Sequence, residues 1–174
     1  MSEPTGALAP SPAAPAGAPE RRACVFTLAG ARFAVDVRST RELAMFHDIT
    51  RVPCAPTSLV GVANLRGTVM PIVDIRRLLD LPAERSGGGS VRTLVLRADA
   101  LQAAVVVDAV LDLEPFDEIA PVEDGDRAGD APGRRFTAGY VTWDGERVGL
   151  LDAPKILEAL MARPMRTGRG AVEG

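Results

Sequence analysis

Residues 61–81 read GVANLRGTVMPIVDIRRLLDL, and the fold is best predicted from this stretch. Two glycines, Gly61 and Gly67, frame a short segment that carries a single arginine, Arg66. Glycine adopts a positive φ more readily than any other residue, so turns are expected at both glycines. The apolar run after the second glycine predicts a β-strand over residues 68–75. A cation at the head of such a strand therefore needs an explanation.

The second part of this stretch is expected to change from strand to helix. Pro71 has no backbone N–H to donate, so the strand should lie at a sheet edge or contain a bulge. Residues 74–81, DIRRLLDL, predict a short helix, because an aspartate stands at the start and apolar residues follow at helical spacing. These apolar residues are Ile75, Leu78 and Leu79.

Short strands are also expected before and after residues 61–81. Residues 23–37 predict two strands around the turn sequence AGAR. Residues 91–99 and 101–113 predict further strands, separated by a turn near Ala98–Ala100. Residues 136–152 predict a hairpin with an Asp-Gly turn. Many short strands at close spacing predict a mostly β protein built of two small antiparallel barrels, one in each half of the chain.

Helical structure is expected only in short pieces. Ser39 or Thr40 is expected to cap one helical turn, and two prolines make residues 50–61 a rigid, non-helical connection. Residues 153–163 predict an amphipathic helix that closes the fold. Its apolar face is expected to carry Ile156, Leu157, Leu160 and Met161.

The composition excludes several classes of protein. The chain has 174 residues, of which 47% are hydrophobic and 25% charged, and this balance is typical of a soluble globular protein. Its net charge of −3 gives no basic footprint for nucleic acid. No apolar run is long enough to span a membrane, and the N-terminus does not read as a signal peptide.

Two cysteines, Cys24 and Cys54, are expected to be buried thiols. Residues 1–21, rich in Ala and Pro, and residues 164–174 are expected to be flexible tails.

The residues that carry out catalysis or bind metals are scarce. His47 is the only histidine, and no serine lies in a nucleophile-elbow motif that could serve it. Residues 124–130, DGDRAGD, resemble the start of a calcium loop, but the ligand expected at the twelfth position is Arg135. Residues 82–90 contain three glycines without a phosphate-binding motif, and are expected to be a linker or a long hairpin loop. The sequence therefore predicts a protein without catalytic activity, metal or cofactor.

Four segments together resemble the CheW family of chemotaxis coupling proteins. These are RVPCAP at 51–56, VGV at 60–62, NLRG at 64–67 and PIVDIR at 71–76. The resemblance continues through VVVDAVLDL, IAPVED and AGYVTWDGERVGLLD, and it covers about residues 23–160. NLRG alone is a weak signal, but its combination with the other segments at these spacings is specific.

The resemblance implies a fold and a set of partners. Family members fold as two five-stranded SH3-like (Src-homology-three) barrels packed around an apolar seam, here over residues 22–163 with a division near 85–90. They are non-catalytic adaptors that bind the regulatory domain of a chemosensory histidine kinase and the cytoplasmic tip of chemoreceptors, and other CheW-like proteins are further candidate partners. The expected location is the cytoplasm, at receptor arrays on the inner membrane, without insertion into the membrane.

The resemblance also assigns partner-binding residues. They are Glu42, Gly61, Val62, Asn64, Leu65, Arg66 and Gly67. Arginine can bind a carboxylate through two N–H groups, so we expect an ion pair between Glu42 and Arg66. Arg66 then has two candidate roles, a structural clasp for the turn or a direct contact with a partner. Val62 and Leu65 are candidates either for the core or for an exposed docking patch.

Two alternatives to a chemotaxis adaptor follow from the sequence. The first is a CheW-like scaffold in a non-flagellar chemosensory pathway that controls surface motility or development. The second is a small β-barrel enzyme or ligand-binding protein. Thr40 stands where the family more usually has an aliphatic residue, which leaves the kinase-facing surface to be defined.

Overall fold

The structure is a computed structural model in which part of the chain is described. The described residues are 21–83, 90–116, 118–123 and 132–162. Apart from Arg21, the two predicted tails lie outside this part, as do most of the glycine-rich stretch and the whole calcium-like loop.

The described residues form ten strands, two 3-10 turns and one α-helix. In chain order they are β1 (Arg22–Leu28), β2 (Ala31–Asp36), η1 (Val37–Ser39), β3 (Thr40–Phe46), β4 (Leu59–Leu65), β5 (Thr68–Val73), β6 (Val91–Ala98), β7 (Leu101–Val106), β8 (Ala109–Pro115), η3 (Arg134–Phe136), β9 (Thr137–Trp143), β10 (Glu146–Leu151) and α1 (Ala153–Met161).

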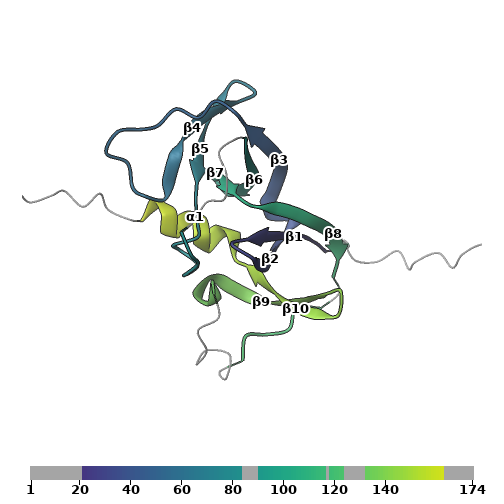
Figure 1. The fold of residues 1–174 in the computed structure, drawn as a ribbon. Coiled ribbons are helices and arrows are strands. Elements are labelled where there is room, and N and C mark those ends of the chain that lie inside the picture. The colour runs from purple at the N-terminus through teal and green to yellow at the C-terminus, as the bar shows by residue number, and fades with distance from the viewer. Residues whose placement is uncertain (1–20, 84–89, 117, 124–131, 163–174) are drawn as a thin grey trace, which may run out of the picture.

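The strands form two five-stranded sheets that close into small barrels (Figure 1). Barrel 1 has the strand order β3-β6-β7-β5-β4, and barrel 2 has the order β8-β1-β2-β10-β9. A backbone bridge between Thr50, just after β3, and Val62 on β4 joins the two edges of barrel 1. An equivalent bridge between Ala120 and Tyr140 joins those of barrel 2. The predicted fold class is confirmed.

The barrels do not follow the two halves of the chain. β1 and β2 pair with β8 and β10 of the second half, whereas β6 and β7 pair with β3 and β5 of the first half. Contrary to the prediction, no boundary between the barrels falls near residues 85–90. The chain instead crosses between the barrels after β2 and after β7. A simple sequence pattern cannot show this, because alternation predicts that a strand exists and not which strand it pairs with.

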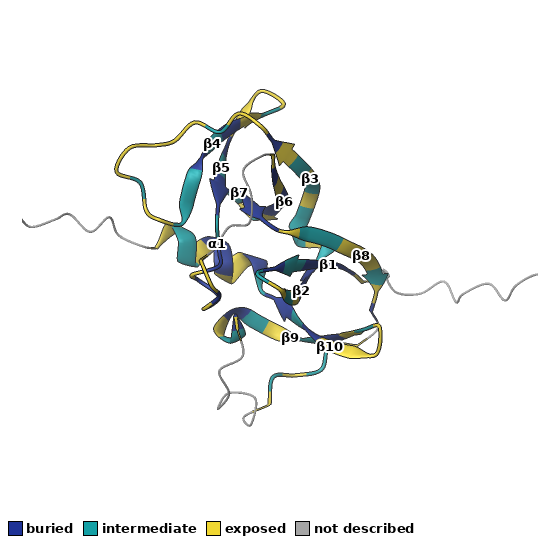
Figure 2. Ribbon diagram, in the orientation of Figure 1, coloured by how far each residue is buried: buried dark blue, intermediate teal, exposed yellow. Residues whose placement is uncertain are grey.

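Three groups of buried side chains hold this arrangement together. Figure 2 colours buried residues dark blue, and they are prominent on β1, β5 and β7. Barrel 1 is filled by a group around Ile72 and Val95, and barrel 2 by a group around Val25 and Val148. The largest group forms a seam between the barrels. It takes residues from both sheets, from residues 75–81 and from the buried face of α1. The side chains of the two barrels are thus packed against one shared core.

The first crossing between the barrels is held by Asp36 rather than by the predicted caps Ser39 or Thr40. The Asp36 carboxylate accepts the backbone N–H of Arg38 at 2.9 Å and pairs with its guanidinium at 2.9 Å. Burial raises the pKa of Asp36, but the hydrogen bonds and charge of Arg38, helped by Arg21, outweigh burial and hold this pKa below its ordinary value. The expected helical turn is therefore only η1, and residues 40–46 form strand β3.

Two predictions for the opening stretch need correction. Strand β5 lies inside the sheet rather than at its edge, and the register shift in its ladder with β4 falls between Leu59 and Gly61 on β4. Pro71 is tolerated because the parallel pairing with β7 begins only at Ile72. Residues 74–81 form hydrogen-bonded turns rather than a helix. Asp80 has a φ of +57°, and the N–H of Leu81 reaches back to the carbonyl of Arg76, so the chain leaves helical geometry after one turn. The apolar residues of this segment still enter the seam.

Smaller expectations had mixed outcomes. Residues 101–113 form two strands, β7 and β8, because the chain crosses to barrel 2 between them. The hairpin at Asp144–Gly145 and the closing helix are confirmed, but Met161 is 72% exposed and lies off the buried face.

Of the two cysteines that are expected to be buried, only Cys24 is, and burial raises the pKa of its thiol, whereas Cys54 is exposed. No helix among the described residues is long and apolar enough to cross a membrane.

The two halves repeat the same hairpin. The β4–β5 and β9–β10 hairpins align without a gap, so that Gly61 corresponds to Gly139 and Gly67 to Gly145. A Cβ on Gly61 would lie 2.5 Å from the carbonyl oxygen of Thr50, and one on Gly139 would collide with Ile119. Both glycines therefore allow the close backbone approach that closes a barrel.

Candidate functional site

The β4–β5 hairpin presents the predicted site at the upper end of barrel 1 (Figure 1). Leu65 pairs with Thr68 across a two-residue turn, in which Arg66 has a φ of +52° and Gly67 a φ of +85°. Positive φ at both central residues is what a type I′ turn requires. The side-chain oxygen of Asn64 accepts the N–H of Gly67 at 2.7 Å, so the asparagine holds the turn.

The predicted ion pair between Glu42 and Arg66 is confirmed. Nη2 of Arg66 lies 2.8 Å from Oε2 of Glu42 on β3. β3 and β4 are the two edges of the barrel 1 sheet, so this pair spans the barrel's closure. The side chain of Arg66 is 80% exposed and that of Glu42 is 29% exposed. An exposed pair of this kind contributes at most about 1 kcal/mol. Arg66 is therefore a weak clasp, and most of its surface is free to meet a partner.

The other predicted residues divide between core and surface. Leu65 is half-buried and packs against the barrel 1 core. The turn expected at Gly61 is wrong, because this glycine lies within β4, has no positive φ and is buried at the barrel's closure. Val62 is half-buried and forms the closing bridge with Thr50. Asn64, Arg66 and Gly67 are exposed together at the end of the hairpin.

Sequence reasoning missed Val69, which adjoins this group and is 69% exposed. The apolar run around it indicates burial on both faces of the strand, and only the observed burial pattern of β5 places this side chain outside. We call Asn64, Arg66, Gly67 and Val69 the hairpin tip.

Exposed apolar side chains also lie on one edge strand of each sheet. Leu43 and Met45 on β3 are 56% and 54% exposed, and Leu111 and Leu113 on β8 are 41% and 47% exposed. Yellow segments mark both strands in Figure 2. β3 and β8 are the corresponding strands of the two barrels, since each begins where the chain crosses between them. We call these four residues the edge-strand surface. Sequence reasoning did not predict the exposed side chains on β3, because a helical turn is expected there.

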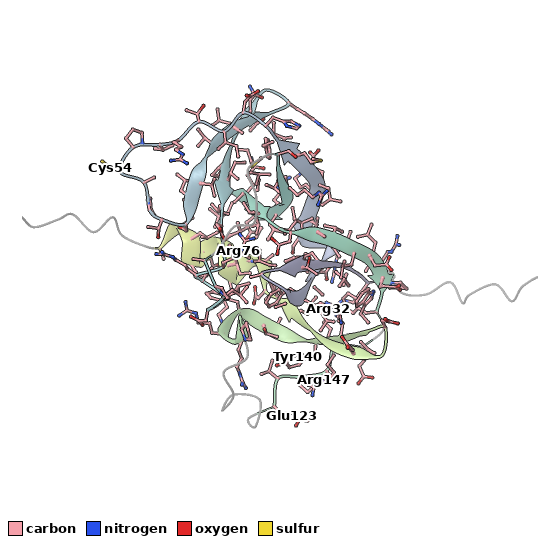
Figure 3. The ribbon with its side chains drawn as sticks, in the orientation of Figure 1. Arg32, Cys54, Arg76, Glu123, Tyr140 and Arg147 are labelled. Carbon is pink, nitrogen blue, oxygen red and sulfur yellow. The ribbon has the colours of Figure 1, made fainter. Side chains whose placement is uncertain are left out.

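An ion-pair network around a buried arginine lies close to the second crossing between the barrels, and sequence reasoning did not find it. Arg76, labelled at the centre of Figure 3, is 3% exposed. Its Nη1 donates to Asp74 at 2.9 Å and its Nη2 donates to Asp108 at 2.6 Å. Asp108 lies at the second crossing and also accepts the N–H of Ala29 at 2.6 Å. One guanidinium thus links the end of β5, the crossing before β8 and the β1–β2 turn.

The described residues offer little for catalysis. No group of three or more His, Cys, Asp or Glu side chains that could hold a metal occurs in the part of the chain that the structure describes. His47 is exposed on the connection after β3. The interiors of both barrels are filled with apolar side chains, as in other small barrels. The candidate site is therefore an outer surface rather than a cavity.

Comparison with known proteins agrees with this geometry. Residues 22–161 match the family model described as a CheW-like domain. The probable chemotaxis protein CheW of Rhizobium etli is 30% identical over 145 residues, which cover 82% of this chain and 88% of the relative. Protein FrzA of Myxococcus xanthus is 31% identical over 149 residues, covering 83% and 90%. The crystal structure of scaffolding protein TtCheW from Thermoanaerobacter tengcongensis matches with a TM-score of 0.63 at 24% identity, covering 76% and 88%.

The fold and the site define a two-barrel β protein whose candidate site is an exposed hairpin tip. The chain belongs to the CheW-like domain family, because the family model spans nearly all of its described residues. The solved structure, at its low identity, supports the fold alone.

Proposed function

We propose that this chain is a non-catalytic adaptor that couples chemoreceptors to a chemosensory histidine kinase. The hairpin tip binds the regulatory domain of the kinase, and the edge-strand surface binds the cytoplasmic tip of the receptors. The adaptor works in the cytoplasm and is recruited to receptor arrays at the inner membrane. Family membership supports the role, and the observation that carries it is the presence of two exposed surfaces on one rigid core.

The hairpin tip has the chemistry of a docking surface. Arg66 keeps most of its guanidinium in solvent and is held in place from one side by Glu42, so its direction is set before a partner arrives. Val69 adds an apolar contact beside it. Arginine is one of the residue types that are enriched where binding energy concentrates in protein interfaces. Gly61 and Val62 support this surface from the closed edge of the barrel rather than meeting the partner.

The edge-strand surface suits an apolar partner. Four large aliphatic side chains stand in solvent on strands that each have a neighbour on only one side. Exposed apolar patches of this kind mark interaction sites in soluble proteins. An amphipathic helix is one kind of partner that docks through its apolar face on an apolar surface.

The adaptor has two candidate pathways. The CheW protein of Rhizobium etli carries chemotaxis in its name, and FrzA of Myxococcus xanthus is similar to this chain over a comparable length. The similarity to FrzA supports a non-flagellar pathway as the second candidate. The same two surfaces serve in either pathway.

The hairpin tip is tested by replacing Arg66 with asparagine. Asparagine tolerates the positive φ of this position, so the change removes the charge and keeps the turn. We expect the affinity for the kinase regulatory domain to fall about tenfold or more, while the free energy of unfolding changes by less than about 1 kcal/mol. Isothermal titration calorimetry and urea denaturation measure the two quantities.

The matched control is Asp144→Asn at the corresponding turn of barrel 2, where φ is +49°. It changes one charge in the same backbone geometry, and kinase affinity should stay within about twofold of the wild type. Kinase binding that survives in Arg66→Asn would sink the assignment of the tip. A large loss of stability in this variant would instead return Arg66 to the role of a clasp.

A further inference from the structure

Each barrel is built from both halves of the chain, and this leaves each half with an unfinished surface. The N-half, residues 22–81, contains β1–β5, and the C-half, residues 91–162, contains β6–β10 and α1. The N-half gives three strands to barrel 1 and two to barrel 2, and the C-half gives two and three. The two halves are therefore complements of each other.

The pairing between the halves is extensive. Four strand ladders join them, β1 with β8, β2 with β10, β3 with β6 and β5 with β7. Buried polar contacts join them as well, since Arg76 of the N-half donates to Asp108 of the C-half, and Gly133 donates its N–H to the carbonyl of Leu79 at 2.7 Å. The seam contains apolar side chains from both. A half on its own would expose all of these groups.

We propose that the surface each half presents fits the other half of a second copy of this chain, so that two chains exchange halves and form a dimer. The N-half of one copy then pairs with the C-half of the other, and the reverse. Every ladder and every seam contact of the single chain is kept, because the contacts depend on which halves meet and not on which chain supplies them. Only the assignment of the covalent link changes, because it then joins an N-half and a C-half that belong to different assembled units.

The balance between the single chain and the dimer depends on protein concentration. Within one chain the two halves are covalently linked and have a high effective concentration for each other, which favours the monomer in dilute solution. When many chains refold together at high concentration, the half of another copy competes. The exchanged dimer carries two hairpin tips and two edge-strand surfaces. This inference stands on the sheet topology and does not depend on the proposed function.

The test uses full-length chains with a charge placed in a barrel interior. Val25 and Ile72 are 0% exposed, and Leu150 is 4% exposed. Val25 and Ile72 belong to the N-half but to different barrels, whereas Leu150 belongs to the C-half and shares barrel 2 with Val25. Aspartate at any of these positions should prevent folding of the single chain, because a charge in an apolar interior has no partner there.

We expect mixtures to fold only when the two lesions lie in different halves. Native near-ultraviolet circular dichroism should return in two mixtures that are refolded together. One contains Val25→Asp and Leu150→Asp, and the other contains Ile72→Asp and Leu150→Asp. The signal should reach at most about half of the wild-type value, because only one of the two assembled units is free of lesions. Light scattering after size-exclusion chromatography should give the mass of a dimer.

Val25→Asp with Ile72→Asp is the control. These lesions lie in different barrels but in the same half. Each assembled unit needs one N-half, and both N-halves in this mixture carry a lesion, so no native signal should return. Native signal in this mixture, or its absence from both mixtures across the halves, overturns the proposal.

The wild-type chain supplies a second measurement that needs no lesion. Two differently tagged wild-type samples are unfolded, mixed at high concentration and refolded. We expect dimers that carry both tags and that persist on dilution, because separating them requires unfolding. If no doubly tagged dimer forms at any concentration, the halves do not exchange.

Discussion

Replacing Arg76 with alanine should lower the free energy of unfolding by about 3 kcal/mol, near the lower end of what removing one partner of a buried ion pair costs. The change leaves Asp74, whose side chain is 16% exposed, without its cation. It also removes the link from β5 to Asp108 at the second crossing. The loss is not larger because Asp108 is 42% exposed and can be hydrated. The Nε of Arg76 is also buried without an acceptor among the described residues, and alanine removes that cost.

Urea denaturation of Arg76→Ala and Arg66→Ala provides a matched comparison. Both variants remove one ion-paired arginine, but Arg76 is buried and pairs with Asp74 and Asp108, whereas Arg66 is exposed and pairs with Glu42. Arg66→Ala should cost less than about 1 kcal/mol. If the two variants lose similar stability, burial does not decide the strength of these pairs, and the ion-pair network of Arg76 contributes little to holding the barrels together.

Replacing Gly61 with alanine should lower the free energy of unfolding by about 3 kcal/mol, at the upper end of the cost of overpacking. The added Cβ would lie 2.5 Å from the backbone oxygen of Thr50 and 2.6 Å from a methyl group of Ile49. A backbone oxygen cannot rotate away, so the bridge between Thr50 and Val62 has to open. Thermal unfolding followed by circular dichroism measures the loss.

Two other glycines calibrate this result. Gly139→Ala should cost a similar amount, because its Cβ would collide with Ile119 and approach the oxygen of Ala120 to 2.8 Å at the corresponding closure of barrel 2. Gly149→Ala on β10 should change the stability by less than about 1 kcal/mol, since its Cβ would meet only Thr137 at 3.5 Å. An equal loss at Gly149 and Gly61 would show that the closure is not tight.

Local structure could be predicted from the sequence where a short pattern decides it. The turn at Arg66–Gly67, the Asp-Gly hairpin and the face of α1 with Ile156 and Leu157 follow from residue type and spacing. The pairing of the strands could not be predicted, because β1 and β8 are far apart in the sequence and alternation carries no information on partners. The crossings after β2 and β7 therefore appeared only in the structure.

The candidate site was predicted in part for similar reasons. Glu42 and Arg66 came from the family resemblance, and their ion pair followed from the chemistry of arginine and carboxylate. Val69 was missed because an apolar run predicts burial on both faces of a strand, whereas β5 is exposed at this end. Asp108 was missed because nothing in the sequence brings a residue after β7 to Arg76.

The adaptor function is tested most directly by asking whether this chain joins the two partners. The kinase regulatory domain is immobilised, the chain is added, and a soluble fragment of the receptor tip is passed over both. We expect the fragment to be captured only when the chain is present. Arg66→Asn should abolish capture by losing the kinase, and the double variant Leu43→Ser with Leu113→Ser should abolish it while the chain itself stays bound. Capture of the receptor fragment without the chain, or no capture with the wild-type chain, would contradict the account.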